Sequence, residues 1–425
     1  MSNLNDQQDF QIIRERMKER PLNRKRLVRR TVITAALAVF FGALACITFL
    51  VLEPVFSNIL SPEEEPERIE IPLDEDEMLP SDMLTDETVT AVSEVAEEGE
   101  TVSNIDQYVQ LYSDIYDLVS NVQKSIVTVA GVDQDVDWFD NEYESKGLTT
   151  GLIVANNGQE LLILCDGDVI KDRENIHITF YNGTVKDGYL KKTDSNTGLA
   201  IVGISINDLS ETLLDPQNIA NLGNSKPSRL IASPVIAIGR PMGNSSSVDY
   251  GMITAKGSYL NMTDINYEMI YTNIYGNENS NGVIVNMKGE ILGIICQDQN
   301  SVDKNIIAAI GISELKRTIE RLSNSDDIAV LGIRGTDVTN EAVEMGVPVG
   351  AYVTSIDMDS PAMNVGIQSG DVIVRVDGTE VESFSEFTEV MYRLKPEAEV
   401  NVMLMRYDGE QYSGMMVRVS MGSTN

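Results

Sequence analysis

Between residues 125 and 311 the chain is a succession of short runs rich in β-branched residues, and this pattern limits its possible folds more than any other feature. Examples are ELLILC, NIHITFYNG and SPVIAIG. Turn signals such as Asn182-Gly183 separate the runs, and helical periodicity is absent until residues 312–322. Many short strands over roughly two hundred residues predict antiparallel barrels or a sandwich.

The N-terminal part has a different character. Residues 1–30 are rich in Arg and Lys, and residues 31–52 (TVITAALAVFFGALACITFLVL) carry no charge. A run of about twenty apolar residues is long enough to span a bilayer core. Basic residues before such a run favour a cytoplasmic N-terminus. Because no small-x-small cleavage site follows, we expect one uncleaved transmembrane helix, with the rest of the chain outside the cytoplasm.

Residues 53–100 form an acidic tract with several prolines and almost no aromatic residues. Like charges repel, and little apolar surface is present to offset chain entropy, so this tract is expected to be a disordered tether. The net charge of the whole chain is -34. Such acidity argues against nucleic acid or an anionic membrane surface as a partner of the soluble part.

A helix is predicted just after the tether, within residues 101–122. Its apolar residues recur at a spacing of three and four, which places them on one face. This face is expected to pack on the core or to dock, with subunit assembly as an alternative. The residues are Ile105, Tyr108, Val109, Tyr112, Ile115, Val119 and Val122.

Two longer runs are more specific. VIAIGRPMGNSSSVDYGMITAKG resembles the strand-turn-strand before the active serine of HtrA/Deg serine proteases, and ENSNGVIVNMKGEILGIIC resembles the segment of that serine. The resemblance implies a trypsin-like double β-barrel within residues 101–322. Residues 323–421, which include VTSIDMDSPAMNVGIQSGDVIVRVDGTEV, resemble the family's PDZ domain. The expected fold is therefore mostly β, with an α+β PDZ domain after the barrels and one transmembrane helix before them.

The resemblance also shows which catalytic parts have changed. Ser280 stands at the nucleophile position, but Asp168 occupies the histidine position and Gly198 the aspartate position. Glu278 stands where the family has the glycine whose N–H helps to form the oxyanion hole. A serine hydroxyl needs a base to take its proton, and an exposed carboxylate is too weak by roughly three pKa units. The protease-like domain is therefore predicted to be inactive.

Other residues are poor substitutes for the missing base. His177 is the single histidine, and strand alternation turns it away from its apolar neighbours. Lys171 and Lys288 are the lysines nearest in sequence to the altered motifs, yet neither has an apolar setting that would lower its pKa.

The PDZ domain does not need a catalytic triad. Such a domain adds an extended peptide as an edge strand and captures its terminal carboxylate with backbone N–H groups of a short loop. By position this peptide-binding loop is Leu331-Gly332-Ile333. The alternative is that the chain's own linker or protease-like domain fills the groove.

Two further motifs allow more than one interpretation. Cys165 and Cys296 fall on strands near the altered site, where a disulfide and buried free thiols are both open. Carboxylates in residues 133–144 follow EF-hand spacing, but Trp138 replaces the essential glycine. No metal or other cofactor is expected.

The chain is thus expected to be a bacterial, membrane-anchored, extracytoplasmic HtrA-like pseudoprotease. It would bind peptides or protein C-termini through its PDZ domain, as a scaffold or regulator in envelope protein quality control. The resemblance implies homotrimers or hetero-oligomers with active relatives. One alternative is an active endopeptidase that uses Ser280 with an unconventional base, and another is a holdase chaperone.

Overall fold

The computed structural model describes residues 32–33, 35–44, 48, 66–74, 104–132, 147–243, 246–297, 300, 303 and 305–423. The chain divides into two units, Met1–Glu65 and Pro66–Asn425. In the first unit, residues 32–33 and 35–44 are helical. Among all the residues described, no helix combines the length and the apolar character that crossing a membrane requires.

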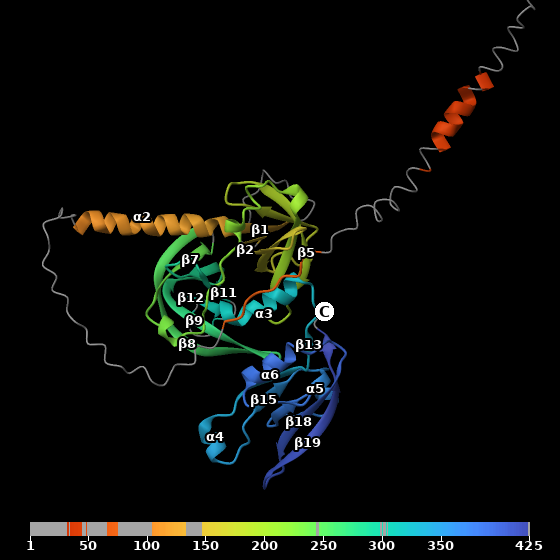
Figure 1. The fold of residues 1–425 in the computed structure, drawn as a ribbon. Coiled ribbons are helices and arrows are strands. Elements are labelled where there is room, and N and C mark those ends of the chain that lie inside the picture. Colours follow the sequence, from red (N-terminus) through yellow and green to blue (C-terminus); the bar gives the residue numbers. More distant parts are fainter. Residues whose placement is uncertain are drawn as a thin grey trace, which may run out of the picture. The chain divides into compact units, whose positions relative to one another are not determined.

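In the second unit, two closed six-stranded barrels follow one another in the sequence (Figure 1). The strand order of the first barrel is β1-β2-β3-β6-β5-β4, and all its neighbouring strands are antiparallel. Its strands are β1 (Ile126–Val132), β2 (Leu148–Asn156), β3 (Glu160–Asp166), β4 (Asn175–Thr179), β5 (Val185–Thr193) and β6 (Leu199–Ser205).

The second barrel has the order β10-β11-β12-β9-β8-β7. Its longest strands, β8 and β9, are joined by the two-residue turn Thr263-Asp264, and this hairpin extends to helix α6 (Phe384–Met391) (Figure 1). The strands are β7 (Pro234–Arg240), β8 (Ser247–Met262), β9 (Ile265–Tyr275), β10 (Asn281–Val285), β11 (Ile291–Ile295) and β12 (Ile306–Gly311).

Apolar side chains of the strands fill both barrels, which confirms the predicted double-barrel fold. The first barrel encloses Val129, Ile163 and Val202, and the second encloses Ile270 and Ile284, all fully buried. A larger core lies between the barrels and helix α3 (Ile312–Ser323), whose apolar face is buried. This inter-barrel core lies where the two barrels and α3 meet.

The predicted helix is α2 (Asn104–Val122), but its apolar stripe is divided. Val119 and Val122 pack on the core, whereas Tyr108 and Tyr112 are exposed. The expected packing therefore holds only for the C-terminal part of the helix. A short 3-10 turn, Gln123–Ser125, leads into β1.

The PDZ domain is a sheet of order β14-β15-β16-β18-β19 with β17 beside β16. Phe384 and Phe387 of α6 are buried against this sheet. The elements are β13 (Ala329–Val330), β14 (Ile333–Asp337), α4 (Asn340–Glu344), β15 (Ala351–Ile356), α5 (Pro361–Asn364), β16 (Val372–Val376), β17 (Thr379–Glu380), α6 (Phe384–Met391), β18 (Glu399–Tyr407), β19 (Tyr412–Ser420) and β20 (Gly422–Ser423).

Part of the predicted tether is ordered, which corrects the expectation for residues 66–74. Ile69 and Ile71 pack against the inter-barrel core, and the backbone N–H of Ile69 donates to Asn324 Oδ1 at 2.9 Å. The Asp74 carboxylate pairs with Lys316 Nζ of α3 at 2.7 Å. We call residues 66–74 the strap. The strap is ordered because Ile69, Ile71 and Asp74 contact residues that are distant in the sequence. Local composition does not reveal these contacts.

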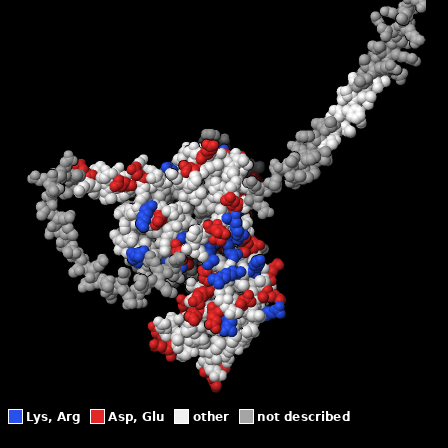
Figure 2. Space-filling view, in the orientation of Figure 1, with Lys and Arg blue, Asp and Glu red and all other residues white. Residues whose placement is uncertain are grey.

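Basic and acidic side chains lie side by side around α3 and the neighbouring PDZ elements (Figure 2). Arg317 of α3 pairs with Glu389 of α6 at 2.5 Å, and the guanidinium of Arg321 donates to the backbone carbonyl of Tyr392. These contacts connect the inter-barrel core to the PDZ domain. The acidic loop 133–144, considered above as a metal site, lies outside the described residues.

Candidate functional site

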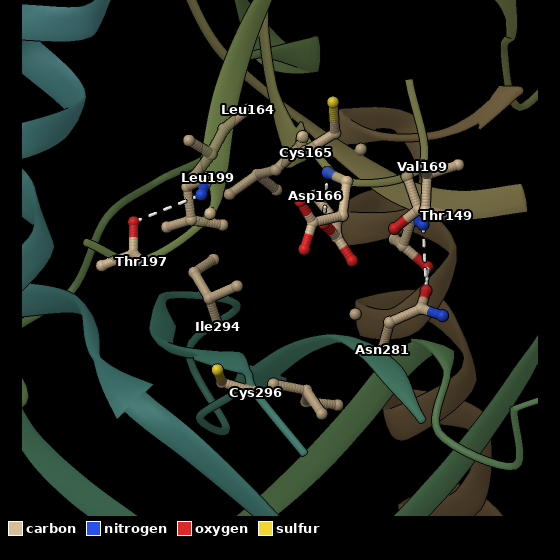
Figure 3. A pocket seen from close by; sticks show the side chains of 18 of the residues that line it. Thr149, Leu164, Cys165, Asp166, Val169, Thr197, Leu199, Asn281, Ile294 and Cys296 are labelled. Atoms are coloured by element: carbon tan, nitrogen blue, oxygen red, sulfur yellow. Dashed lines mark hydrogen bonds between the residues drawn. The ribbon is translucent and has the colours of Figure 1, made fainter. Parts of the chain in front are cut away.

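A cavity of about 740 Å³ lies where the two barrels meet. Its walls come from β2, β3 and the 167–171 turn of the first barrel and from the 278–283 segment of the second. Figure 3 shows side chains from both barrels turned toward the same space. The four positions singled out from the protease resemblance all line it: Asp168, Gly198, Glu278 and Ser280.

Two backbone groups hydrogen-bond to the Ser280 hydroxyl. Its Oγ donates to the carbonyl of Pro241 and accepts from the N–H of Asn277 at 2.8 Å. The side chain is 4% exposed. Because the proton already points at a carbonyl oxygen, which cannot remove it, this geometry does not activate the hydroxyl for attack.

The backbone around Ser280 is also committed to a turn. The N–H of Ser280 donates to the carbonyl of Asn277 at 3.0 Å, and the N–H of Asn279 donates to Asn277 Oδ1 at 2.9 Å. An oxyanion hole needs the serine N–H directed at the substrate oxygen. Glu278, the altered position beside it, is exposed. In this conformation the Ser280 N–H donates to the turn and is not available to an oxygen in the cavity.

Asp168 and Gly198 face each other on the first-barrel side. A Cβ built on Gly198 would lie 4.0 Å from Asp168 Oδ2. Gly198 has a φ of +74°, which side-chain-bearing residues adopt with strain. The Asp168 side chain is exposed, and its N–H donates to Asp166 Oδ1 at 2.9 Å. The positions that the resemblance matches to the histidine and the aspartate are thus adjacent, but neither carries the imidazole that a serine-protease triad uses as its base.

Asn281, next to the serine, joins the two barrels. Its Oδ1 accepts from both the N–H and the Oγ1 of Thr150, at 2.9 and 2.7 Å. Figure 3 shows Asn281 directed at the β2 side of the cavity. This side chain gives the altered motif a structural role that sequence reasoning missed, because only the fold brings Thr150 beside it.

Among the residues that the structure describes, none of the candidate replacement bases contacts the Ser280 hydroxyl. His177 is on β4, where its Nδ1 is 2.7 Å from Asp187 Oδ1 of β5, and it does not line the cavity. Lys171 lines the cavity but is exposed, and Lys288 is exposed in the turn between β10 and β11. None of the three hydrogen-bonds to Ser280 Oγ, whose partners within the described residues are Pro241 and Asn277.

Both described cysteines line the cavity as thiols, without a disulfide between them. Cys165 belongs to the first-barrel core, and Cys296 packs against the inter-barrel core. Burial raises the pKa of the Cys165 thiol well above its ordinary value, so this thiol stays protonated near neutrality. It therefore acts as an apolar packing group.

The peptide-binding loop predicted in the PDZ domain holds a carboxylate of the same chain. Asp264, in the β8–β9 turn, accepts from the N–H of Leu331 at 2.7 Å, of Gly332 at 2.9 Å and of Ile333 at 3.0 Å. Gly332 has a φ of +87°, and a Cβ there would lie 2.2 Å from Ser360 Cβ. The loop therefore has the conformation of a carboxylate-binding nest.

Asp264 is buried, and this environment perturbs its acidity. Burial raises the pKa of Asp264 to about 6, and the nearby Asp357 carboxylate acts in the same direction. The hydrogen bonds from the loop N–H groups lower it in part. Sequence reasoning did not single out Asp264, because a polar residue between two strand-like runs indicates only a turn. In this conformation Asp264 of the protease-like domain occupies the loop, which agrees with the alternative at that position.

Comparisons with known proteins agree with this architecture. Residues 149–294 match the trypsin-like peptidase domain family and residues 329–414 match the PDZ domain family. The serine protease Do-like HtrB of Bacillus subtilis is 25% identical over 360 residues, which cover 77% of this chain and 75% of HtrB. The serine endoprotease DegS of Haemophilus influenzae is 27% identical over 63% of this chain and 75% of its own.

A probable periplasmic DegP-like serine endoprotease of Halomonas elongata is 28% identical, and the chain spans 54% of its length. Among solved structures, the HtrA-type protease AlgW with a tripeptide has a TM-score of 0.52 at 21% identity, over 74% of this chain and 97% of AlgW. That likeness shows the fold.

The fold and the two sites define a trypsin-like domain linked to a PDZ domain. The two matched domain families and these relatives together support an HtrA-family protein.

Proposed function

We propose that this protein is an HtrA-like pseudoprotease that binds peptides or protein C-termini through its PDZ domain, as a scaffold or regulator of envelope protein quality control. The proposed loss of proteolytic activity rests on one observation. The Ser280 hydroxyl donates to the Pro241 carbonyl and not to a base. The Asp168 and Gly198 substitutions and the engaged Ser280 N–H support it. Losses of base and oxyanion donor each cost several kcal/mol of transition-state stabilisation, about 3–4 for one donor.

Peptide binding is supported by the chemistry of the Leu331–Ile333 loop. Its three N–H groups donate to one carboxylate, and this arrangement supports the binding of a terminal carboxylate. The AlgW structures, which share the fold, contain a tripeptide or a decapeptide.

The membrane anchor and the outward orientation are proposed from the uncharged run 31–52 and the basic cluster before it. The trimer, or assembly with active relatives, is proposed from the family resemblance. Extraction at alkaline pH tests the anchor: the protein should stay with the membrane pellet. Release into the supernatant would contradict it.

The activity test compares the full chain, Ser280→Ala and trypsin on unfolded casein and with a fluorophosphonate probe. The expected result is no cleavage and no labelling of Ser280 above the Ser280→Ala background, while trypsin reacts in both assays. Cleavage or labelling that Ser280→Ala abolishes would establish an active endopeptidase. Suppressed aggregation of a denatured client without cleavage, and without saturable peptide binding, would favour a holdase instead.

A further inference from the structure

Asp264 contacts the PDZ domain as the last residue of a bound peptide would. Its carboxylate accepts from the three N–H groups of the peptide-binding loop. Its own N–H donates to the carbonyl of Ile333 at 2.7 Å, and its carbonyl accepts from Thr388 Oγ1 of α6 at 2.9 Å. The residue therefore satisfies both the terminal-carboxylate site and the backbone groups that pair with an added strand.

The residues after Asp264 continue along the same groove. Asn266 Nδ2 donates to the carbonyl of Gly335 on β14 at 3.1 Å, and β9 contacts both α6 and β14. On the other side of the turn, Thr263 Oγ1 donates to the Asp357 carboxylate. Because the turn uses the donors and acceptors that a peptide would use, the two cannot occupy the groove together.

We propose that the Thr263-Asp264 turn is an internal ligand of the PDZ groove, which a partner's C-terminal carboxylate must displace. This inference rests on the proposed peptide-binding function. The groove is then closed in the absence of a partner, and the apparent affinity for a C-terminal peptide is reduced by the fraction of molecules that are open. The ligand class is a polypeptide with a free terminal carboxylate, since such a group reproduces the charge and the contacts of the Asp264 carboxylate.

The ion pair between Arg317 and Glu389 across this junction is a weaker restraint. Both side chains are partly exposed, and exposed ion pairs contribute little to stability. Asp264, by contrast, is 7% exposed and makes charge-assisted hydrogen bonds to three donors. Removal of its carboxylate should therefore release the groove selectively.

The test uses Asp264→Gly, because glycine removes the carboxylate and accepts the φ of 61° at this position. The matched control is Asp172→Gly, an exposed aspartate with the same φ of 61° in the first barrel. Full chains in detergent are titrated with a pool of fluorescein-labelled decapeptides of randomised sequence with a free C-terminus, and with the same pool amidated. Hydrogen exchange of the Leu331, Gly332 and Ile333 amides is measured without peptide.

The expected result is an affinity of Asp264→Gly for the free-carboxylate pool about tenfold higher or more than that of the wild type, with faster exchange of the three amides. Asp172→Gly should behave as the wild type, and amidated peptides should not bind better. Equal affinity of wild type and Asp264→Gly would overturn the internal ligand while the peptide-binding function stands. Faster amide exchange in Asp264→Gly, with no peptide binding by either Asp264→Gly or the wild type, would overturn the peptide-binding function. It would also overturn the proposed competition between the turn and a peptide.

Discussion

Asp168 Oδ2 lies 4.0 Å from the position that a Cβ would take on Gly198, so the two positions that the family resemblance matches to the triad histidine and aspartate are neighbours. The geometry of the pair explains why simple reversal should not recover a protease. Gly198 adopts a φ of +74°, and Ser280 is committed to backbone partners in the opposite wall of the cavity.

The double variant Asp168→His/Gly198→Asp should therefore remain inactive. A histidine at 168 supplies a base, but the Ser280 proton still points at Pro241 and the Ser280 N–H still bonds to Asn277. We expect fluorophosphonate labelling slower than that of trypsin by a factor of about 10³ or more. Labelling at a rate near that of trypsin would show that the Ser280 loop rearranges readily.

Asn281→Ala should lower the free energy of unfolding by about 1–3 kcal/mol, because it leaves the N–H and Oγ1 of Thr150 without their acceptor. Urea denaturation followed by circular dichroism measures this. Asn279→Ala is the control, since that neighbouring side chain is exposed. Equal stability of the two variants would argue that water replaces the Asn281 contact without cost.

Asp74→Ala should destabilise the second unit by about 3–5 kcal/mol, because it leaves the buried Lys316 ammonium unpaired. Arg68→Ala, which breaks the exposed strap pair with Asp326, should change stability by about 1 kcal/mol or less. Urea midpoints of the two variants and the wild type provide the comparison. A loss as small for Asp74→Ala as for Arg68→Ala would indicate that the strap contributes little to stability.

The contribution of Asp264 to folding stability should fall as pH rises. Its pKa in the folded chain is about 6, above the ordinary 3.8, so the folded state binds more protons between these values. The associated stabilisation is fully present below about pH 3.8 and is lost as pH rises through about 6, at about 1.4 kcal/mol per pKa unit. Asp264→Asn keeps the shape and does not titrate.

The measurement for this prediction is the free energy of urea unfolding of wild type and Asp264→Asn at about pH 4.5 and about pH 7.5. The wild type should gain stability relative to the variant at the lower pH. Comparison with the variant cancels the titration of the other carboxylates. A difference between the two proteins that is the same at both pH values would mean that Asp264 does not titrate in this range.

Local patterns predicted most of the architecture. Alternating apolar residues and turn signals indicated the barrels, and the PDZ motifs indicated the domain that carries Phe384 and Phe387 in its core. The strap was predicted wrongly as disordered, since Ile69 and Asp74 are stabilised by residues some 250 positions away in sequence. The half-exposed stripe of α2 was likewise not visible from its periodicity, which is uniform along the helix.

The sequence alone determined which chemical groups are available at the positions that the resemblance indicates: the hydroxyl of Ser280, the carboxylate of Asp168 and no side chain at Gly198. Tertiary structure decided what those groups do. In the folded chain the Ser280 hydroxyl donates to the Pro241 carbonyl, and the Asp264 carboxylate accepts from the peptide-binding loop. The physical reason is that hydrogen bonds between distant segments depend on where the barrels and the long β8–β9 hairpin place their ends, and no local pattern encodes that placement.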